Sequence, residues 1–246
     1  MQADFSVELG GDFPALEIPW RSDDPNVRFY DLKNHPELVL QIPEARAYPE
    51  LASFLGRINA PGFPLATAKC DVWSSNEVSP EEEIFGDRKF ISYVDLILVD
   101  EKDRYSFEKN EAFAQELCRL LGHAPEIAAT VDLVIRHCYY HDEFALLGEQ
   151  GQSSPQESEK DDFLHFDDLK TPPSKKDRTA PSQKSGRFQQ EPNSRREGRN
   201  NSVRGFCITS YVTGFGDSDQ DPVRRWTIGL NLLQHAIVQL SAPPKH

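Results

Sequence analysis

The segments VDLVIRHCYYH (residues 131–141) and GFCITSYVTGFG (residues 205–216) decide the predicted fold. Both are rich in β-branched and aromatic residues, which favour strands. A long stretch rich in Ser, Pro, Gln, Lys and Arg separates them. Because loop-closure entropy grows only logarithmically with loop length, the two strands can still pair as one antiparallel hairpin. We therefore predict a single domain, formed by residues 1–147 together with 204–242, that is interrupted by an insertion.

The predicted insertion spans residues 148–203, and a short polar tail spans 243–246. The insertion holds too little apolar surface to offset the conformational entropy of an ordered chain, so we predict that it is disordered, like the tail. Its charge is segregated, with seven acidic residues and one basic residue in 149–168, and ten basic and three acidic residues in 170–204. The two halves nearly cancel, so the predicted domain carries the acidic charge of the chain.

Other segments repeat the plan of two strands followed by a helix. Residues 66–73 and 90–100 read as strands, and Ser106 can cap a helix that ends at Gly122. Residues 15–20 and 27–32 flank the turn sequence RSDDPN and read as an earlier pair.

Prolines mark the helices expected after the first pair of strands. Helical pieces are expected at 36–42 and 49–58, where Pro36 and Pro49 suit a first helical position. We expect Pro43 to break a single long helix here. A short strand is expected at Phe5–Leu9, before all of these elements.

The clearest periodicity follows the helix-start signal Asp221-Pro222. Apolar residues recur there at spacings of three and four: Val223, Trp226, Leu230, Leu233, Ile237 and Leu240. The pattern predicts a helix that packs on the sheet. A coiled-coil seam between two copies is the alternative, although fewer than three heptads are present.

Together these segments predict an α+β fold. We expect an antiparallel sheet built from three β-hairpin–helix units, with the helices on one face. The opposite face would then carry the polar positions of the strands.

Strand alternation predicts which side chains share that opposite face. They are Lys69, Asp71, Trp73, Arg136, Tyr140 and Tyr211. Mixed charge combined with aromatic rings suits a binding site for a polar ligand or a protein partner. The alternative is a solvated face with cross-strand ion pairs.

Asp95 interrupts the apolar run ISYVDLILV and is therefore expected to be buried. A buried carboxylate needs a partner, and Lys69 or Arg136 could supply it. With a raised pKa, Asp95 could act as a general base, and Asp71 and Lys69 are the other catalytic candidates. A structural ion pair would explain the same pattern.

Metal and cofactor signals are weak. His137 and His141 return to the same face of a strand, but no further ligand follows at a telling spacing. The four cysteines form no CxxC pair, and no nucleotide-binding glycine motif is present. We therefore expect no metal and no cofactor.

Composition limits the classes of partner that we expect. The chain carries 27 Lys and Arg against 40 Asp and Glu, so we expect no direct nucleic-acid binding by the predicted domain. We expect no membrane association and a cytoplasmic location, because no long apolar stretch or secretory signal is evident. One apolar island, residues 161–169 with Phe163 and Phe166, is predicted to contact another protein.

These observations favour a non-catalytic intracellular binding or regulatory protein that uses the polar and aromatic sheet face and the disordered arm. The alternative is an enzyme that acts on a small polar or anionic metabolite with carboxylate acid–base residues on that face.

Overall fold

The computed structural model describes residues 1–13, 15–22, 28–141 and 202–242. Its strands are β1 (Gln2–Glu8), β2 (Leu16–Ile18), β3 (Leu65–Ser75), β4 (Arg88–Leu98), β5 (Ala129–His141) and β6 (Ser202–Gly216). Its α-helices are α1 (Pro43–Ala47), α2 (Pro49–Ile58), α3 (Glu101–Arg104), α4 (Phe107–Leu121) and α5 (Asp221–Leu240). Two short 3₁₀ helices are η1 (Pro36–Gln41) and η2 (Glu83–Phe85).

The chain divides into two compact units, residues 1–149 with 200–246 and residues 150–199. The second unit lies outside the described residues. The predicted insertion also lies outside them, except for Ser202 and Val203, which begin β6. The island with Phe163 and Phe166 and the predicted tail 243–246 likewise fall outside the described part of the chain.

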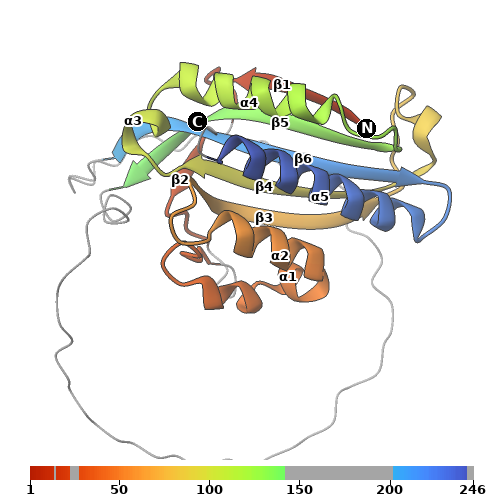
Figure 1. Ribbon diagram of the computed structural model, residues 1–246, viewed down its shortest axis with the longest axis horizontal. Helices are drawn as coiled ribbons and strands as arrows, with labels where there is room; N and C mark the ends of the chain where they lie inside the picture. The colour runs from red at the N-terminus through yellow and green to blue at the C-terminus, as the bar shows by residue number, and fades with distance from the viewer. Residues whose placement is uncertain (14, 23–27, 142–201, 243–246) are drawn as a thin grey trace, which may run out of the picture. The chain divides into compact units, whose positions relative to one another are not determined.

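The sheet is mixed, with the strand order β1-β5-β6-β4-β3 (Figure 1). The pairs β3–β4, β4–β6 and β5–β6 are antiparallel, so the predicted pairing of residues 131–141 with 205–216 is confirmed. The expectation of a purely antiparallel sheet is wrong, because β1 and β2 both pair parallel to β5. Most of the sheet is nevertheless antiparallel.

The predicted first pair of strands, 15–20 with 27–32, does not form a hairpin within the described residues. Leu16–Ile18 joins the edge of β5 instead, and residues 28–32 contain no strand. The physical reason is burial. Ile18 is fully buried against Cys138 and Tyr140 of β5, a contact that a local hairpin would not provide.

The larger core joins α2, α4 and α5 to one face of the sheet (Figure 1). The helix predicted from Asp221 forms, and Trp226, Leu230, Leu233 and Ile237 of its apolar stripe are buried in this core. The Trp226 indole donates a 2.8 Å hydrogen bond to the Ser92 hydroxyl of β4, which fixes the helix above the central strands.

Close contact at Gly214 brings α5 onto β6. A Cβ at this position would overlap backbone atoms of Pro222 and Trp226. The absence of a side chain on Gly214 therefore allows the first turn of α5 to touch the strand directly.

Helix boundaries follow local chemistry. The Ser106 hydroxyl accepts a hydrogen bond from the backbone N–H of Lys109, and α4 ends before Gly122, as predicted. Pro43 prevents a single long helix, as predicted: η1 ends at Gln41, and Pro43 starts α1, whose first position needs no N–H donor.

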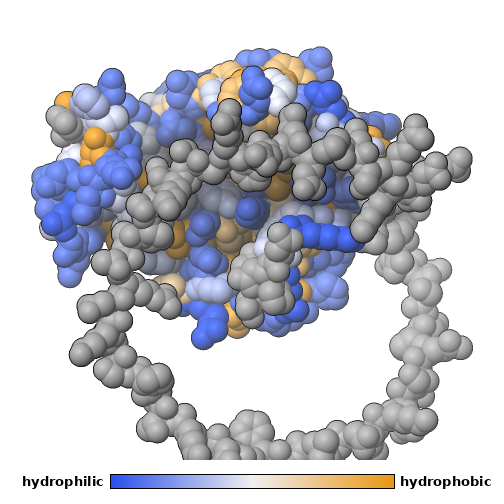
Figure 2. Space-filling view, turned by 180° about the vertical axis from the view of Figure 1, so that it is seen from behind, coloured by the Kyte–Doolittle hydropathy of each residue, from blue (hydrophilic) through white to orange (hydrophobic). Residues whose placement is uncertain are grey.

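The other face of the sheet carries a smaller apolar cluster and a wide polar area. The cluster consists of Ile18, Ala68, Ile97, Cys138, Tyr140 and Cys207. Figure 2 shows the molecule from this side, where hydrophilic and hydrophobic side chains are mixed. We call this side the open face.

Candidate functional site

Asp95 lies at the centre of the open face and is buried, as predicted, with 5% of its surface exposed. Register places it opposite Thr209 of β6, whose hydroxyl donates a 2.6 Å hydrogen bond to the Asp95 carboxylate. The expected direct partner was Lys69 or Arg136. Arg136 is instead connected to Asp95 through Thr209, because its Nη1 donates to the Thr209 hydroxyl oxygen at 3.4 Å.

Burial raises the pKa of Asp95 to about 6. The hydrogen bond from Thr209 and the positive charges of Arg136 and Lys69 act in the opposite direction but do not cancel the effect of burial. The carboxyl group can therefore gain or lose a proton close to neutral pH.

Arg136 is held in place from several sides. Its Nε donates to the Glu8 carboxylate of β1 at 2.9 Å, and its Nη2 forms an ion pair with the same oxygen at 2.8 Å. Its Nη1 also donates to the Tyr211 hydroxyl at 3.2 Å. Each of its three nitrogens therefore has a partner, which makes Arg136 a fixed charge in the floor of the site.

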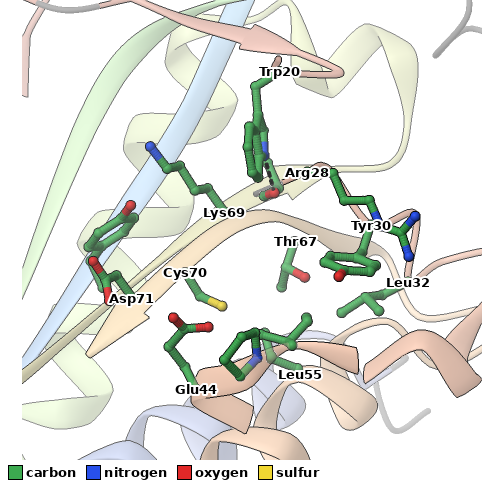
Figure 3. A pocket seen from close by; sticks show the side chains of 14 residues that line it. Trp20, Arg28, Tyr30, Leu32, Glu44, Leu55, Thr67, Lys69, Cys70 and Asp71 are labelled. Carbon is green, nitrogen blue, oxygen red and sulfur yellow. Dashed lines mark hydrogen bonds between the residues drawn. The ribbon is translucent and has the colours of Figure 1, made fainter. Parts of the chain in front are cut away.

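Two cavities meet at this face. The first, which we call the Cys70 cavity, has a volume of about 350 Å³ (Figure 3). It reaches round the edge strand β3 to Leu32, Ile42 and Leu55 of the larger core. Its lining includes Trp20, Arg28, Tyr30, Glu44, Lys69, Cys70, Asp71 and Tyr93. The second, which we call the Asp95 cavity, has a volume of about 360 Å³ and is lined by Ala15, Leu16, Lys69, Tyr93, Asp95, Arg136, Cys207, Thr209 and Tyr211.

Lys69 and Tyr93 line both cavities, so the two meet at these side chains. The Lys69 ammonium lies 5.5 Å from the centre of the Trp20 ring, in a cation–π contact. Trp20 is itself fixed, since its indole N–H donates to the Ala68 carbonyl oxygen at 2.8 Å. Among the described residues, no carboxylate or carbonyl oxygen accepts a hydrogen bond from Lys69.

A row of aromatic rings crosses the strands beside this junction. Trp73 and Tyr93 have ring centres 6.3 Å apart, and Tyr93 and Tyr211 have ring centres 5.9 Å apart. The Arg136 guanidinium extends the row, 5.8 Å from the Tyr211 ring. The row offers flat apolar surface next to charged groups.

The Cys70 thiol lies in a negative environment. Burial and the charges of Glu44, Asp71 and Asp95 raise its pKa to about 12. The thiol therefore stays protonated at neutral pH and is a poor nucleophile. In Figure 3, Asp71 of β3 lies to the left of Cys70 and Glu44 of α1 lies below it.

Most of the residues predicted for the site meet here. Lys69, Asp71, Asp95, Arg136 and Tyr211 all line one or both of the two cavities.

Trp73 and Tyr140, the remaining candidates, line neither cavity. Trp73 contributes through its contact with Tyr93 and is 38% exposed. Tyr140 is 3% exposed and donates a 2.6 Å hydrogen bond to the Phe206 carbonyl oxygen, in the small apolar cluster.

Several lining residues were not proposed from the sequence. Tyr93 and Thr209 could have been found by alternation, since each shares a face with a candidate on its own strand. Trp20, Tyr30 and Glu44 come from segments outside the sheet core, and no local pattern places them beside β3.

The histidines considered as metal ligands are separately engaged. His141 lies 3.6 Å from the Glu17 carboxylate, whereas His137 packs on Phe206 and contacts the Arg204 guanidinium. Within the described ranges, no group of three or more His, Cys, Asp or Glu side chains is arranged to hold a metal ion.

In comparisons with known proteins, no family model, curated protein or solved structure matches the chain. In the part of the chain that the structure describes, none of the helices has the length and apolar character needed to cross a membrane. The site must therefore be interpreted from its own chemistry.

Proposed function

We propose that this protein is a non-catalytic binding protein whose open face takes a small polar ligand at the junction of the Cys70 and Asp95 cavities. The observation that carries the proposal is the position of the Lys69 side chain. Its ammonium belongs to the lining of both cavities and has no hydrogen-bond acceptor among the described residues.

The surroundings of Lys69 support binding of a specific ligand over a merely solvated surface. Trp20 and Arg136 are held by hydrogen bonds to Ala68 and Glu8, so one group in each cavity that Lys69 lines is positioned in advance. Fixed polar groups beside aromatic rings in a cavity of a few hundred Å³ are typical of small-molecule sites.

A thermal-shift panel tests this proposal. The full chain is screened against amino acids, mono- and dicarboxylates, sugar phosphates and nucleotides, and each compound that raises the melting temperature is titrated by calorimetry. We expect Lys69→Gln to weaken binding at least tenfold. The matched control is Lys109→Gln on α4, an exposed lysine on the helical side. The proposal fails if no class raises the melting temperature, or if Lys69→Gln binds as tightly as Lys109→Gln.

One observation favours a second candidate, an enzyme acting on a polar metabolite. Asp95 has a pKa near 6 and lines a cavity, which suits a general base. In that case Asp95→Asn would abolish turnover of a compound found in the panel while keeping its affinity. If the wild type shows no turnover and Asp95→Asn binds the compound more weakly, Asp95 is a binding residue and not a catalytic one.

The partner contact of the 161–169 island and the cytoplasmic location remain parts of the proposal that rest on sequence alone. Replacing Phe163 and Phe166 together with Ala should abolish capture of a protein partner without changing the melting temperature. Unchanged capture would contradict the predicted contact.

A further inference from the structure

Charged groups of both signs line the two cavities. The Cys70 cavity contains the carboxylates of Glu44 and Asp71 with the cation of Arg28, and the Asp95 cavity contains Arg136 with the buried Asp95 carboxyl group. Lys69 belongs to both linings. A ligand at the junction would therefore meet the carboxylates of Glu44 and Asp71 on one side and the Lys69 ammonium on the other.

The carboxylates in the Cys70 cavity are available to a ligand. Asp71 accepts a hydrogen bond from the backbone N–H of the next residue, Val72, and forms no ion pair within the described residues. Glu44 likewise has no ion pair in that part of the chain. Their combined field is felt at the Cys70 thiol, where both charges oppose ionisation.

The cavity adds more than negative charge. The rings of Trp20, Tyr30 and Tyr93 line it together with Leu55, so a chain of methylene groups or a small ring would meet apolar surface between the charged ends. Figure 3 shows Trp20 and Tyr30 on the side of the cavity away from Glu44.

Local charge balance favours a ligand with both signs of charge over a ligand with a single sign. Two cations, Arg28 and Lys69, and two carboxylates, Glu44 and Asp71, line the Cys70 cavity. A simple anion would approach the carboxylates unfavourably, and a simple cation would approach Lys69 unfavourably. A ligand with both charges satisfies both sets of groups.

We propose that the junction site binds a zwitterionic amino-carboxylate, with its ammonium between Glu44 and Asp71 and its carboxylate against Lys69. The ligand class is thus a compound with an amine and a carboxylate joined by an apolar linker. This inference rests on the proposed function, because it assumes that the junction is a binding site.

Calorimetry with three probes of six carbon atoms each tests the inference. The full chain is titrated with 6-aminohexanoate, with hexanoate, which lacks the amine, and with hexylamine, which lacks the carboxylate. The titrations with the zwitterion are repeated with 4-aminobutanoate and 8-aminooctanoate to cover shorter and longer ligands. We expect at least one amino-carboxylate to bind tenfold or more tightly than either singly charged probe.

Variants assign each end of the ligand. Glu44→Gln and Asp71→Asn should each remove most of the advantage of the zwitterion over hexanoate, whereas Lys69→Gln should remove its advantage over hexylamine. The controls are Glu126→Gln and Lys109→Gln, which change exposed residues outside both cavities and should alter nothing.

The outcomes separate this inference from the proposed function. If hexanoate binds as tightly as every amino-carboxylate and Lys69→Gln abolishes its binding, the zwitterion inference is wrong and the binding site stands. If none of the amino-carboxylates binds, the inference is also wrong, and the metabolite panel decides the proposed function independently.

Discussion

The Thr209 hydroxyl lies 2.6 Å from the Asp95 carboxylate and bridges it to the Arg136 guanidinium. A hydroxyl has one proton, which it donates to Asp95, so its oxygen is left to accept from Arg136. The bridge stabilises a carboxylate that burial would otherwise disfavour still more. It also keeps the carboxylate and the guanidinium from forming a direct pair at this point of the sheet.

The first prediction concerns the pH dependence of stability. The pKa of Asp95 rises from 3.8 to about 6 on folding. Between these values the folded protein binds a proton that the unfolded chain does not, so the contribution of Asp95 to stability falls as pH rises from about 4 to 6. A difference of this size corresponds to roughly 3 kcal/mol.

Asp95→Asn should remove this dependence while keeping an acceptor for Thr209. The measured quantity is the free energy of unfolding of the variant minus that of the wild type, obtained by urea denaturation. We expect this difference to be roughly 2–3 kcal/mol larger at pH 7.5 than at pH 4.2. Asp71→Asn, at an exposed site on the same face, is the control and should show little such gain. An equal stability difference at both pH values would contradict the assignment.

The second prediction tests the contact of α5 with β6. Gly214→Ala should cost about 3 kcal/mol in the free energy of unfolding, because the added methyl group overlaps the backbone of Pro222 and Trp226. Gly56→Ala in α2 is the matched control. A methyl group there meets no atom within 4 Å and should stabilise the helix by about 1 kcal/mol. Similar effects at the two glycines would show that the helix does not touch the strand at Gly214.

A third prediction separates burial of α5 from a coiled coil. Leu233 is fully buried, so Leu233→Asp should lower the free energy of unfolding by more than about 3 kcal/mol. Ile228 on the same helix is 38% exposed, and Ile228→Asp should have little effect. Light scattering of both variants is the second measurement. A Leu233→Asp protein that keeps its melting temperature and changes from dimer to monomer would support the coiled-coil seam instead.

The fourth prediction concerns the predicted insertion. Removal of residues 150–199, with the ends joined directly, should leave a protein that unfolds cooperatively within a few degrees of the full chain. The reason is that β5 and β6 already pair over thirteen positions, from Ala129–Gly214 to His141–Ser202. Broad or absent unfolding in calorimetry would show that the removed residues belong to the folded domain.

Local patterns predicted the long elements of the fold well. The strands β3 to β6 and the helices α4 and α5 follow from periodicity and capping, which depend on residues close in the chain. The parallel strand β2 has three residues, and its position depends on contact with distant Tyr140 and Cys138. A pattern confined to neighbouring residues contains no information about such a partner.

The same division applies to the site. Alternation placed Lys69, Asp71, Arg136 and Tyr211 on one face because a strand repeats every two residues. It fails at the register shift between Thr67 and Cys70, which brings Ala68 into the small apolar cluster of the open face. The walls made by Trp20 and Glu44 depend on how distant segments cross the sheet, which local spacing cannot predict.

The strand order also determines when each strand can pair with its neighbour during translation. Glu8 of β1 contacts Arg136 of β5 across 128 residues of chain, and β2 uses the same strand. At the usual speed of translation, β1 waits on the order of ten seconds for its neighbour in the sheet. During that interval β3 and β4 can already pair, and β4 exposes the edge that β6 later covers. The growing chain is therefore most open to strand pairing with other chains after β4 has been made and before β6 has been made.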